Sequence, residues 1–401
     1  MKRILVILLV LSLLLAGCGK APQMDAAEPS GVTDPSTPAH PSEPAVEDDS
    51  MAPSYTQQPM VAVSVPATTK YVTDDNGNVL FSHTRQNIHL TLQDPEVADK
   101  IIIDFLGRIE QTNVLADMIY KQAINDVPTE FPYTFQLLYS PVRIDQNVLS
   151  LYGTTLVYSG GIHPDRNCTA ANYNMITGDV LTLGSIITGT SAIEALYQQI
   201  IQILEENRDF YCLLGGYKQV VHEILFSEES YNESWFFSPT GLCFYFPPYE
   251  IAPYSSGIII VEVPYENLTG IIGDEFFPPE ITPASGEVAV LRRVEADMSA
   301  FTQIAEVTID DGGEMFLLYT DNTVYDVRLE VGSWDEDCTV FTPTYTAFAA
   351  KSLTPGDAVM GEAYFPDVVP ILRLSYVSGT ETVYFFIHQS GMDGSIYLSS
   401  Q

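Results

Sequence analysis

Two adjacent carboxylates, Asp310 and Asp311, are the residues whose types and spacing most suggest catalysis. They follow an apolar run and precede Gly312-Gly313, and such a pair of acids could hold a metal ion. A catalytic zinc site also needs nitrogen ligands, and the sequence offers only His388 downstream. Asp-Asp-Gly-Gly between two apolar runs is typical of a hairpin turn. We therefore expect a hairpin turn at this position, no metal centre and no cofactor.

The histidines and a second acidic cluster also have side chains that could bind a metal ion. His163 follows two glycines, but His83, His89 and His222 form no recognisable ligand spacing with it. We expect a structural histidine that is hydrogen-bonded within its own loop. The run Asp335-Glu336-Asp337 could hold a cation, but its composition favours a solvated turn.

Four cysteines follow Cys18 in the sequence, namely Cys168, Cys212, Cys243 and Cys338. Outside the cytoplasm these four thiols could form disulfides in three different ways. Buried free thiols are the alternative, because an unpaired cysteine packs as a small hydrophobic residue. Their spacing does not resemble a zinc site, and the sequence leaves both alternatives open.

The composition is that of a folded but strongly acidic protein. The chain has 401 residues, 46% of them hydrophobic, and a formal net charge of -35. That content suffices for real hydrophobic cores in two or three domains. The charge argues against nucleic acid as a partner and favours basic proteins or cations. The alternative is an acidic surface that only maintains solubility.

The N-terminus has the features of a bacterial secretion signal. Lys2 and Arg3 precede the apolar run Ile4–Leu15, which is too short for a confident membrane span. The sequence Leu15-Ala16-Gly17-Cys18 resembles the bacterial lipobox. That resemblance implies removal of residues 1–17 and a diacylglycerol on the sulfur of Cys18. We expect a lipoprotein anchored in the cell membrane on its extracytoplasmic face.

Composition then divides the rest of the chain into three parts. Residues 18–60 are rich in proline and acidic residues and show no hydrophobic period, which predicts a disordered tether. Residues 61–277 are expected to form an α+β domain, an antiparallel sheet with packed helices. Pro278, Pro279 and Pro283 mark a linker, and residues 286–401 are expected to form a small all-β domain.

Several local signals place the elements of the α+β domain. Residues 61–70 are expected to form a first strand, and Asn76-Gly77 predicts the hairpin turn that leads to the next one. Asp94-Pro95 caps a helix that runs to about Gln122, with apolar residues at four-residue spacing. A capping box at Ser191 and Glu194 predicts the start of a second long helix. A shorter helix covers about residues 217–225.

Two segments of this domain resemble a known family. The first runs from Tyr158-Ser159-Gly160-Gly161-Ile162-His163-Pro164 to Thr177-Gly178-Asp179-Val180-Leu181-Thr182-Leu183, and the second is Phe244-Tyr245-Phe246-Pro247-Pro248-Tyr249-Glu250-Ile251-Ala252-Pro253-Tyr254-Ser255-Ser256-Gly257. Both are similar to signatures of the RsiV-type extracytoplasmic domain, over about residues 61–272. Ile162 stands where that family usually has Ala, and Asn174 where it usually has Asp.

The resemblance implies an extracytoplasmic α+β domain of a family that includes lysozyme-sensing anti-sigma factors and domains beside peptidoglycan deacetylases. The segment Thr308-Ile309-Asp310-Asp311-Gly312 also looks like the deacetylase metal motif, but it lacks the histidines that complete it. We therefore expect a non-enzymatic binding or sensing module for an envelope component or for a basic protein such as lysozyme. An enzyme or accessory arm of peptidoglycan modification is the alternative.

The glycine loop and the proline-stiffened connection supply the candidate binding residues. They are Tyr158, Gly160, Gly161, Ile162, His163, Tyr249 and Tyr254. Binding would need exposed aromatic anchors. The alternative places Tyr158, Tyr249 and Tyr254 in the core, where aromatic residues near strand ends usually pack.

Overall fold

The structure, a computed structural model, describes residues 59–126, 131–226, 234–280, 284–366 and 369–400. The predicted signal segment, Cys18 and nearly all of the predicted tether lie outside these residues. The described chain is a mixed α+β structure with several antiparallel sheets, and its C-terminal region is largely β, as the sequence predicts. In these ranges no helix is long and apolar enough to cross a membrane.

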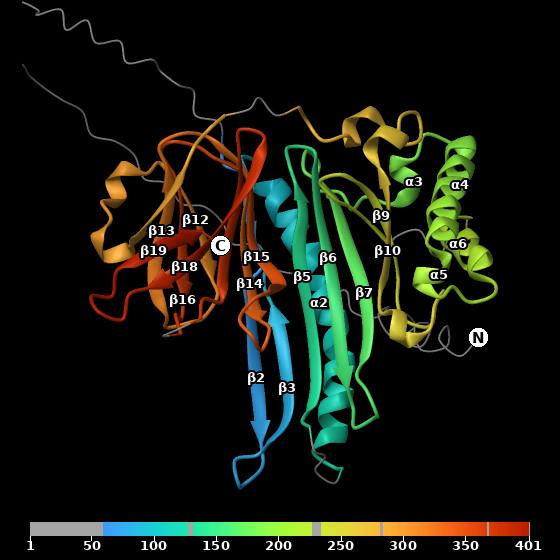
Figure 1. The fold of residues 1–401 in the computed structure, drawn as a ribbon, viewed down its shortest axis with the longest axis horizontal. Coiled ribbons are helices and arrows are strands. Elements are labelled where there is room, and N and C mark those ends of the chain that lie inside the picture. Colours follow the sequence, from blue (N-terminus) through green and yellow to red (C-terminus); the bar gives the residue numbers. More distant parts are fainter. Residues whose placement is uncertain (1–58, 127–130, 227–233, 281–283, 367–368, 401) are drawn as a thin grey trace, which may run out of the picture. The chain divides into compact units, whose positions relative to one another are not determined.

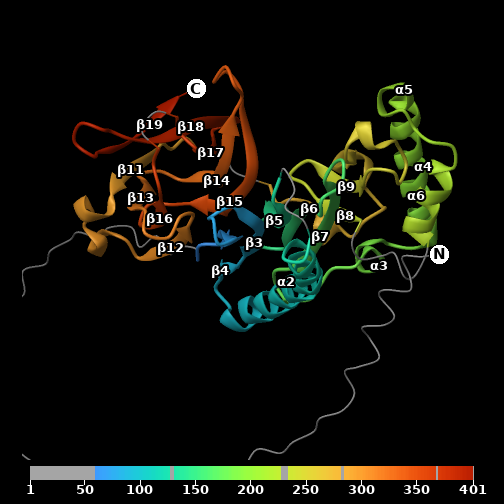
Figure 2. The same cartoon turned by 90° about the horizontal axis from the view of Figure 1, so that it is seen from below.

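A five-stranded sheet carries the first long helix on one of its faces. Its strand order is β2 (Ala67–Thr73), β3 (Val79–Gln86), β5 (Tyr133–Ile144), β6 (Val148–Tyr158) and β7 (Asp165–Asn174). The helix α2 (Pro95–Ala123) lies along β3 and β5 (Figures 1 and 2). Its buried face includes Ile101 and Phe105, which belong to the same hydrophobic cluster as the inward side chains of β5 and β6.

Two local predictions in this region are confirmed. The carboxylate of Asp94 accepts hydrogen bonds from the backbone N–H groups of Glu96 and Val97, so it caps α2 as expected. The turn between β2 and β3 contains Gly77 at a φ of +85°, a conformation that favours glycine. Asp74 accepts bonds from the N–H of Asn78 within the same turn.

The predicted first strand, residues 61–70, is divided in the structure. It forms β1 (Ala62–Ser64) and β2, with Pro66 between them. Proline has no N–H to donate and therefore interrupts a ladder of backbone hydrogen bonds. The two pieces enter different sheets, because β1 pairs with β15 and β4 whereas β2 pairs with β3.

A helical region packs on a small three-stranded sheet. Its elements are α3 (Leu183–Ile186), α4 (Thr190–Glu206), α5 (Arg208–Tyr211), α6 (Tyr217–Phe226), β8 (Trp235–Phe237), β9 (Gly241–Phe246) and β10 (Ile259–Pro264). The predicted capping box at Ser191 is wrong. Gly189 is the N-cap of α4, and Glu194 instead accepts a hydrogen bond from Gln198 one turn later. A capping box is present at Thr182, at the start of α3.

The C-terminal region contains a seven-stranded and a four-stranded sheet. The first has the order β19 (Ile396–Ser400), β18 (Glu381–Gln389), β17 (Leu372–Ser378), β14 (Val324–Trp334), β15 (Phe341–Leu353), β1, β4 (His89–Thr91). The second has the order β11 (Val288–Arg292), β13 (Glu314–Thr320), β16 (Asp357–Ala363), β12 (Gln303–Thr308). Short 3-10 helices complete the described chain: η1 (Tyr254–Ser256), η2 (Tyr265–Asn267), η3 (Asp274–Phe276), η4 (Arg293–Glu295) and η5 (Met298–Ala300).

Strand β1 joins the N-terminal part of the chain to the C-terminal sheet. Ala62 pairs with Ala350 of β15, and the N–H of Val65 donates to the carbonyl of Ala347 at 2.8 Å. The compact unit that contains these contacts spans residues 57–401. The limits 61–277 and 286–401 stay a prediction, but the C-terminal sheet includes strands from before residue 92.

Candidate functional site

The glycine loop, residues 159–164, connects the paired strands β6 and β7. Gly160 has a φ of +83°, so this turn needs a residue that tolerates the left-handed region. A Cβ on Gly161 would meet nothing nearer than the carbonyl of His163 at 3.7 Å, and that position imposes no such demand. Ile162 at the tip of the loop is fully exposed, with a relative accessibility of 103%.

The proline-stiffened connection, residues 247–254, links β9 to β10. Ile251 and Ala252 are buried in the core of the helical region and anchor this segment. The N–H of Tyr249 donates to the carbonyl of Ala252 at 2.9 Å, which closes a tight turn. Tyr249 has a φ of +71° and an exposed fraction of 60%. A bulky residue rarely adopts this backbone conformation, so the turn holds the ring outward at a cost in strain.

These two segments, about ninety residues apart in sequence, meet in the structure. The ring of His163 stacks on that of Tyr254, with 3.9 Å between centroids and an angle of 25°. The hydroxyl of Tyr254 donates to the carbonyl of Pro164 at 2.7 Å. Tyr249 lies 5.7 Å from Tyr254, measured between ring centroids. We call the surface formed by Ile162, His163, Tyr249 and Tyr254 the aromatic loop patch.

The structure separates Tyr158 from this patch. Its ring lies 6.4 Å from that of Tyr133 in the neighbouring strand β5, and 6.4 Å from that of Phe131, which precedes this strand. The expectation of a structural histidine in the loop is confirmed in part, since Nδ1 of His163 lies 3.3 Å from the Pro164 carbonyl. The alternative that all three tyrosines lie in the core is wrong, because Tyr249 is exposed and Tyr158 and Tyr254 are half-buried.

The residues that suggested catalysis have structural roles. The carboxylate of Asp310 accepts from the N–H of Tyr364 at 3.2 Å, and the turn brings Gly312 to a φ of +82°. The turn is therefore confirmed, but the hairpin is wrong because β16 lies between β12 and β13. The other proposed ligand, His388, is bonded to the hydroxyl of Ser399 at 2.7 Å.

The second acidic cluster also forms a turn. Asp335 accepts hydrogen bonds from the N–H groups of Thr339 and Val340. Among the residues that the structure describes, no group of three or more His, Cys, Asp and Glu side chains is placed to hold a metal ion.

All four cysteines of the folded part have free thiols. Cys243 is buried and Cys168 is half-buried, whereas Cys212 and Cys338 are exposed. Burial raises the pKa of the Cys168 thiol to about 11 and that of the Cys243 thiol to about 12. The thiolate is the nucleophilic form, so these two side chains are suited to packing rather than to reaction at neutral pH.

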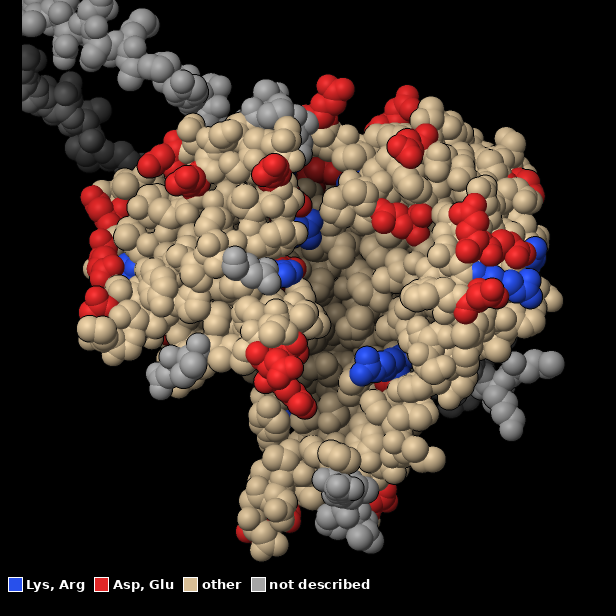
Figure 3. Space-filling view, viewed as in Figure 1, with Lys and Arg blue, Asp and Glu red and all other residues tan. Residues whose placement is uncertain are grey.

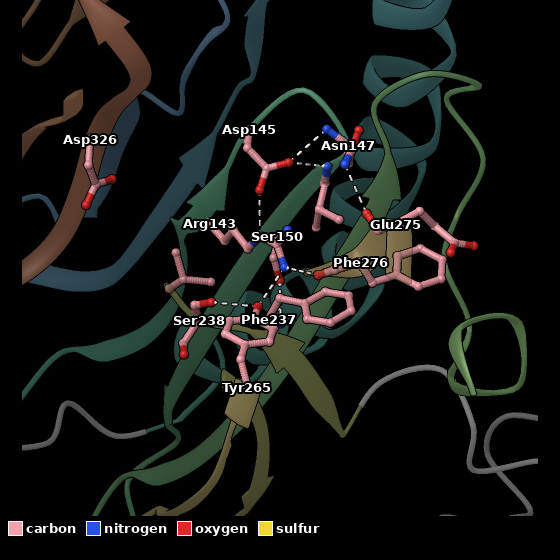
Figure 4. Close-up of polar contacts among 12 residues, drawn as sticks. Arg143, Asp145, Asn147, Ser150, Phe237, Ser238, Tyr265, Glu275, Phe276 and Asp326 are labelled. Atoms are coloured by element: carbon pink, nitrogen blue, oxygen red, sulfur yellow. Dashed lines mark hydrogen bonds and ion pairs between the residues drawn. The ribbon is translucent and has the colours of Figure 1, made fainter. Parts of the chain in front are cut away.

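A buried arginine on β5 is the centre of the main polar cluster that the sequence did not predict. Arg143 is 3% exposed, and its Nε donates to Asp145 at 2.7 Å (Figure 4). Its Nη1 donates to the hydroxyl of Tyr265 and to the carbonyl of Phe276, each at 2.6 Å. The guanidinium also lies 5.1 Å from the ring centroid of Phe237. The sequence did contain a signal for this pair. Arg143 and Asp145 carry opposite charges and are two residues apart beside an apolar strand, and side chains at that spacing lie on the same face of a strand.

Arg143 therefore connects the five-stranded sheet to the segments around β8 and η3. Asp145 in turn accepts hydrogen bonds from the N–H groups of Asn147 and Val148, which fixes the tight turn between β5 and β6. We interpret this cluster as a structural clamp that holds the helical region against the sheet on which the glycine loop is built.

The surface of the described chain carries many acidic side chains, and some of them lie beside the patch. Acidic side chains predominate over basic ones on the face shown in Figure 3 and are spread widely across it. Next to the patch, Glu250 follows Tyr249 and Asp165 follows Pro164, and both acidic residues are exposed. A field of this sign mainly accelerates the approach of a cationic protein.

Comparisons with known proteins support part of the resemblance. Residues 186–266 match the family model described as "Protein of unknown function (DUF3298)". The second signature, residues 244–257, lies inside the match, whereas the first, residues 158–183, precedes it. No curated protein matches the chain.

Two solved structures of that family are similar to the chain. One is a DUF3298 family member from Bacteroides fragilis, with 16% identity, a TM-score of 0.39, and coverage of 54% of this chain and 94% of that one. The other is a DUF3298 family protein from Pseudomonas aeruginosa, with 15% identity, a TM-score of 0.38, and coverage of 54% and 97%.

Proposed function

We propose that this protein is a non-enzymatic binding module on the extracytoplasmic face of the cell membrane, and that the aromatic loop patch binds a basic protein such as a lysozyme. The observation that carries this proposal is the contact between the two signature segments. The stack of His163 on Tyr254 leaves Ile162 and Tyr249 outward on an anchored surface.

The physical chemistry of this patch supports binding more than catalysis. Exposed aromatic and apolar side chains on rigid supports are typical anchors of protein interfaces, and a few of them supply most of the binding energy. The hydrogen bond from Tyr254 to Pro164 reduces the conformational entropy that binding would otherwise remove. The acidic surface would raise the association rate of a basic protein, and salt would reduce this effect by screening the charges.

Binding of a c-type lysozyme to residues 19–401 should be measured by surface plasmon resonance. We expect Tyr249→Asn to weaken binding by about thirtyfold or more, mainly through a faster off-rate, because an anchor contributes about 2 kcal/mol. Asparagine tolerates the positive φ of this position, so the substitution should leave the turn intact. Ile162→Ala should weaken binding in the same way. The on-rate should fall steeply as salt rises.

Two other exposed residues provide matched controls. Tyr71 is 65% exposed and Met392 is 98% exposed, and both lie outside the patch. Tyr71→Asn and Met392→Ala should leave the affinity unchanged. Equal losses in the patch and control variants would contradict the proposal, as would no saturable binding at low salt. Binding to purified peptidoglycan instead would contradict the choice of partner.

The membrane anchor is a separate part of the proposal, and it rests on the lipobox-like sequence around Cys18. In cells given a labelled fatty acid, the wild-type protein should carry the label and fractionate with membranes. Cys18→Ala should lose the label, because its sulfur is the expected attachment atom. Cys212→Ala removes an exposed thiol elsewhere and should keep it. Full labelling of the Cys18→Ala protein would show that this assignment is wrong.

A further inference from the structure

The outer face of α2 carries a stripe of exposed apolar side chains. Ile103, Val114 and Met118 have exposed fractions of 71%, 56% and 61%, and Leu106 and Leu115 are also exposed. The inner face of the helix packs on the five-stranded sheet, and in Figure 2 its outer face is turned away from the rest of the described chain. A stripe of this kind along one helix points to a contact surface. It shares no residue with the aromatic loop patch, so an inference from it does not depend on the proposed function.

Gly107 lies within this stripe, and the described chain shows no need for a glycine there. It has a helical backbone in the interior of α2, and a Cβ at this position would meet no atom within 4 Å. Glycine weakens the interior of a helix relative to alanine. On a helix surface, however, it lets the backbone approach a neighbouring chain closely. This position therefore suits a close contact with another helix.

The spacing of the stripe is the same from either end. Its central row consists of Ile103, Gly107, Val114 and Met118. These four are separated by four, seven and four residues, and at 3.6 residues per turn they lie within about 60° of each other around the helix axis. Leu106 and Leu115 flank the row, one on each side. The midpoint of the row lies between Glu110 and Gln111.

A second α2 laid antiparallel across this face would match the row to itself. Around a two-fold axis at the midpoint, Ile103 would lie at the level of Met118 of the second copy. Gly107 would lie at the level of Val114, so the missing side chain on one helix faces a large one on the other. A two-fold interface uses the same surface on both subunits, and this row has the symmetry that such an interface needs. Spacings of four and seven also match the seam along which two helices pack side by side.

Other occupants suit this stripe less well. The exposed charged residues on the same side of α2 are Asp99, Lys100, Glu110, Asp117 and Lys121. Acidic residues outnumber lysines among them, whereas helices that lie on a membrane are rich in lysine and arginine beside their apolar face. Residues 19–58 are acidic themselves and contain few large apolar side chains that could cover the row. A second copy brings an apolar row of the same length.

We propose that this stripe is a homodimer interface, in which two copies pack α2 against α2 in antiparallel direction. The row spans about four helical turns, which is a small contact by the standard of stable interfaces. We therefore expect reversible association, with a dissociation constant on the order of 10 μM.

Sedimentation equilibrium of the full-length protein in a density-matched detergent measures this association. Val114→Lys should weaken it by about thirtyfold or more, because a charge enters the apolar contact. Val294 is the matched control, since it is 79% exposed but lies in η4, and Val294→Lys should leave association unchanged. Gly107→Ala should have two effects of opposite sign. The melting temperature of the dilute monomer should rise, because alanine is the better helix former, and association should weaken by about tenfold, because the new Cβ enters the space of Val114.

Disulfide cross-linking in the membrane tests the direction of the helices. Two differently tagged full-length chains, one with Ile103→Cys and one with Met118→Cys, are co-expressed with the exposed Cys212 and Cys338 replaced by serine. Oxidation should join the two different chains to each other. It should not join two copies of the Ile103→Cys chain, because the same residue on two antiparallel helices lies about 22 Å apart along the axis.

Several outcomes would overturn the inference. One is a monomer at all concentrations up to about 100 μM, ten times the expected dissociation constant. Equal loss of association in Val114→Lys and Val294→Lys would place the contact elsewhere. A Gly107→Ala protein that melts higher but associates like the wild type would show that no helix approaches this glycine. Cross-linking of the Ile103→Cys chain to itself alone would show a parallel pair.

Discussion

Arg143→Ala should lower the free energy of unfolding by about 3–5 kcal/mol, because it leaves a buried carboxylate without its partner. Asp145 is 5% exposed and lies 2.7 Å from Arg143 Nε. The substitution also leaves the hydroxyl of Tyr265 and the carbonyl of Phe276 without this donor. Urea denaturation should show the loss as a lower midpoint with an unchanged slope.

A second variant separates the effect of the unpaired charge from the effect of the lost side-chain volume. Arg143→Met with Asp145→Asn removes both charges, and the asparagine Oδ1 can still accept from the turn N–H groups of Asn147 and Val148. This double variant should be more stable than Arg143→Ala, because the unpaired buried charge is gone. A double variant as unstable as the single one would show that the unpaired buried charge is not the main cause of the loss in stability.

The pair between Arg373 and Glu330 is a matched control. Its N–O distance is also 2.7 Å, but the two side chains are 17% and 14% exposed, against 3% and 7% for Arg143 and Asp145. Solvent screens a more exposed pair, so Arg373→Ala should cost less than Arg143→Ala. Equal losses of unfolding free energy for Arg143→Ala and Arg373→Ala would show that burial does not set the contribution of these ion pairs.

Local structure was predictable from the sequence where all the groups that determine it lie within one short segment. The Asp94 cap and the Gly77 turn are such cases, because each depends on groups within a few residues. Ser191 shows the limit of this reasoning. The pattern of Ser191 and Glu194 was present, but the backbone of α4 begins earlier, at Thr190 after Gly189, where no side-chain cap forms.

The candidate site was predictable in its parts but not in its assembly. Glycine and proline signals identified both loops of the aromatic loop patch. The stack of His163 on Tyr254 depends on where two sheets place their loops, and no short-range pattern carries that information. Tyr158 was included for its nearness in sequence to the glycines, but it points toward strand β5 and its aromatic residues.

Strand pairing was the least predictable level. The sequence gives a β pattern on both sides of Asp310-Asp311, which looks like a hairpin. The parallel pairing of β12 with β16 separates the two strands, and it joins residues more than fifty positions apart.

Residues 286–401 expressed alone should fail to form a stable fold, although the sequence predicts them as a domain. Without the N-terminal part, the sheet loses β1 and β4, and β15 becomes an exposed edge of the remaining strands. The core would also lose Met60 and Ala62, which are buried at 2% and 1% exposure.

Contacts from β14 add to this dependence. The guanidinium of Arg328 donates to the carbonyls of Pro141 and Val142, each at 2.9 Å, and the isolated fragment has neither carbonyl. Arg328 is only 15% exposed at its side chain, so its charge would lose partners in a partly buried place. We expect the fragment to lack a cooperative thermal transition by circular dichroism.

The control is residues 57–401, which should melt in a single transition. Arg328→Ala in this longer chain should lower its stability without abolishing the fold, because β1 still pairs with β15. Two protease-resistant pieces, with a cooperative melt for 286–401 alone, would instead support the domain limits predicted from the proline-rich linker. In that case the pairing of β1 with β15 would be an attachment between independent domains rather than part of one core.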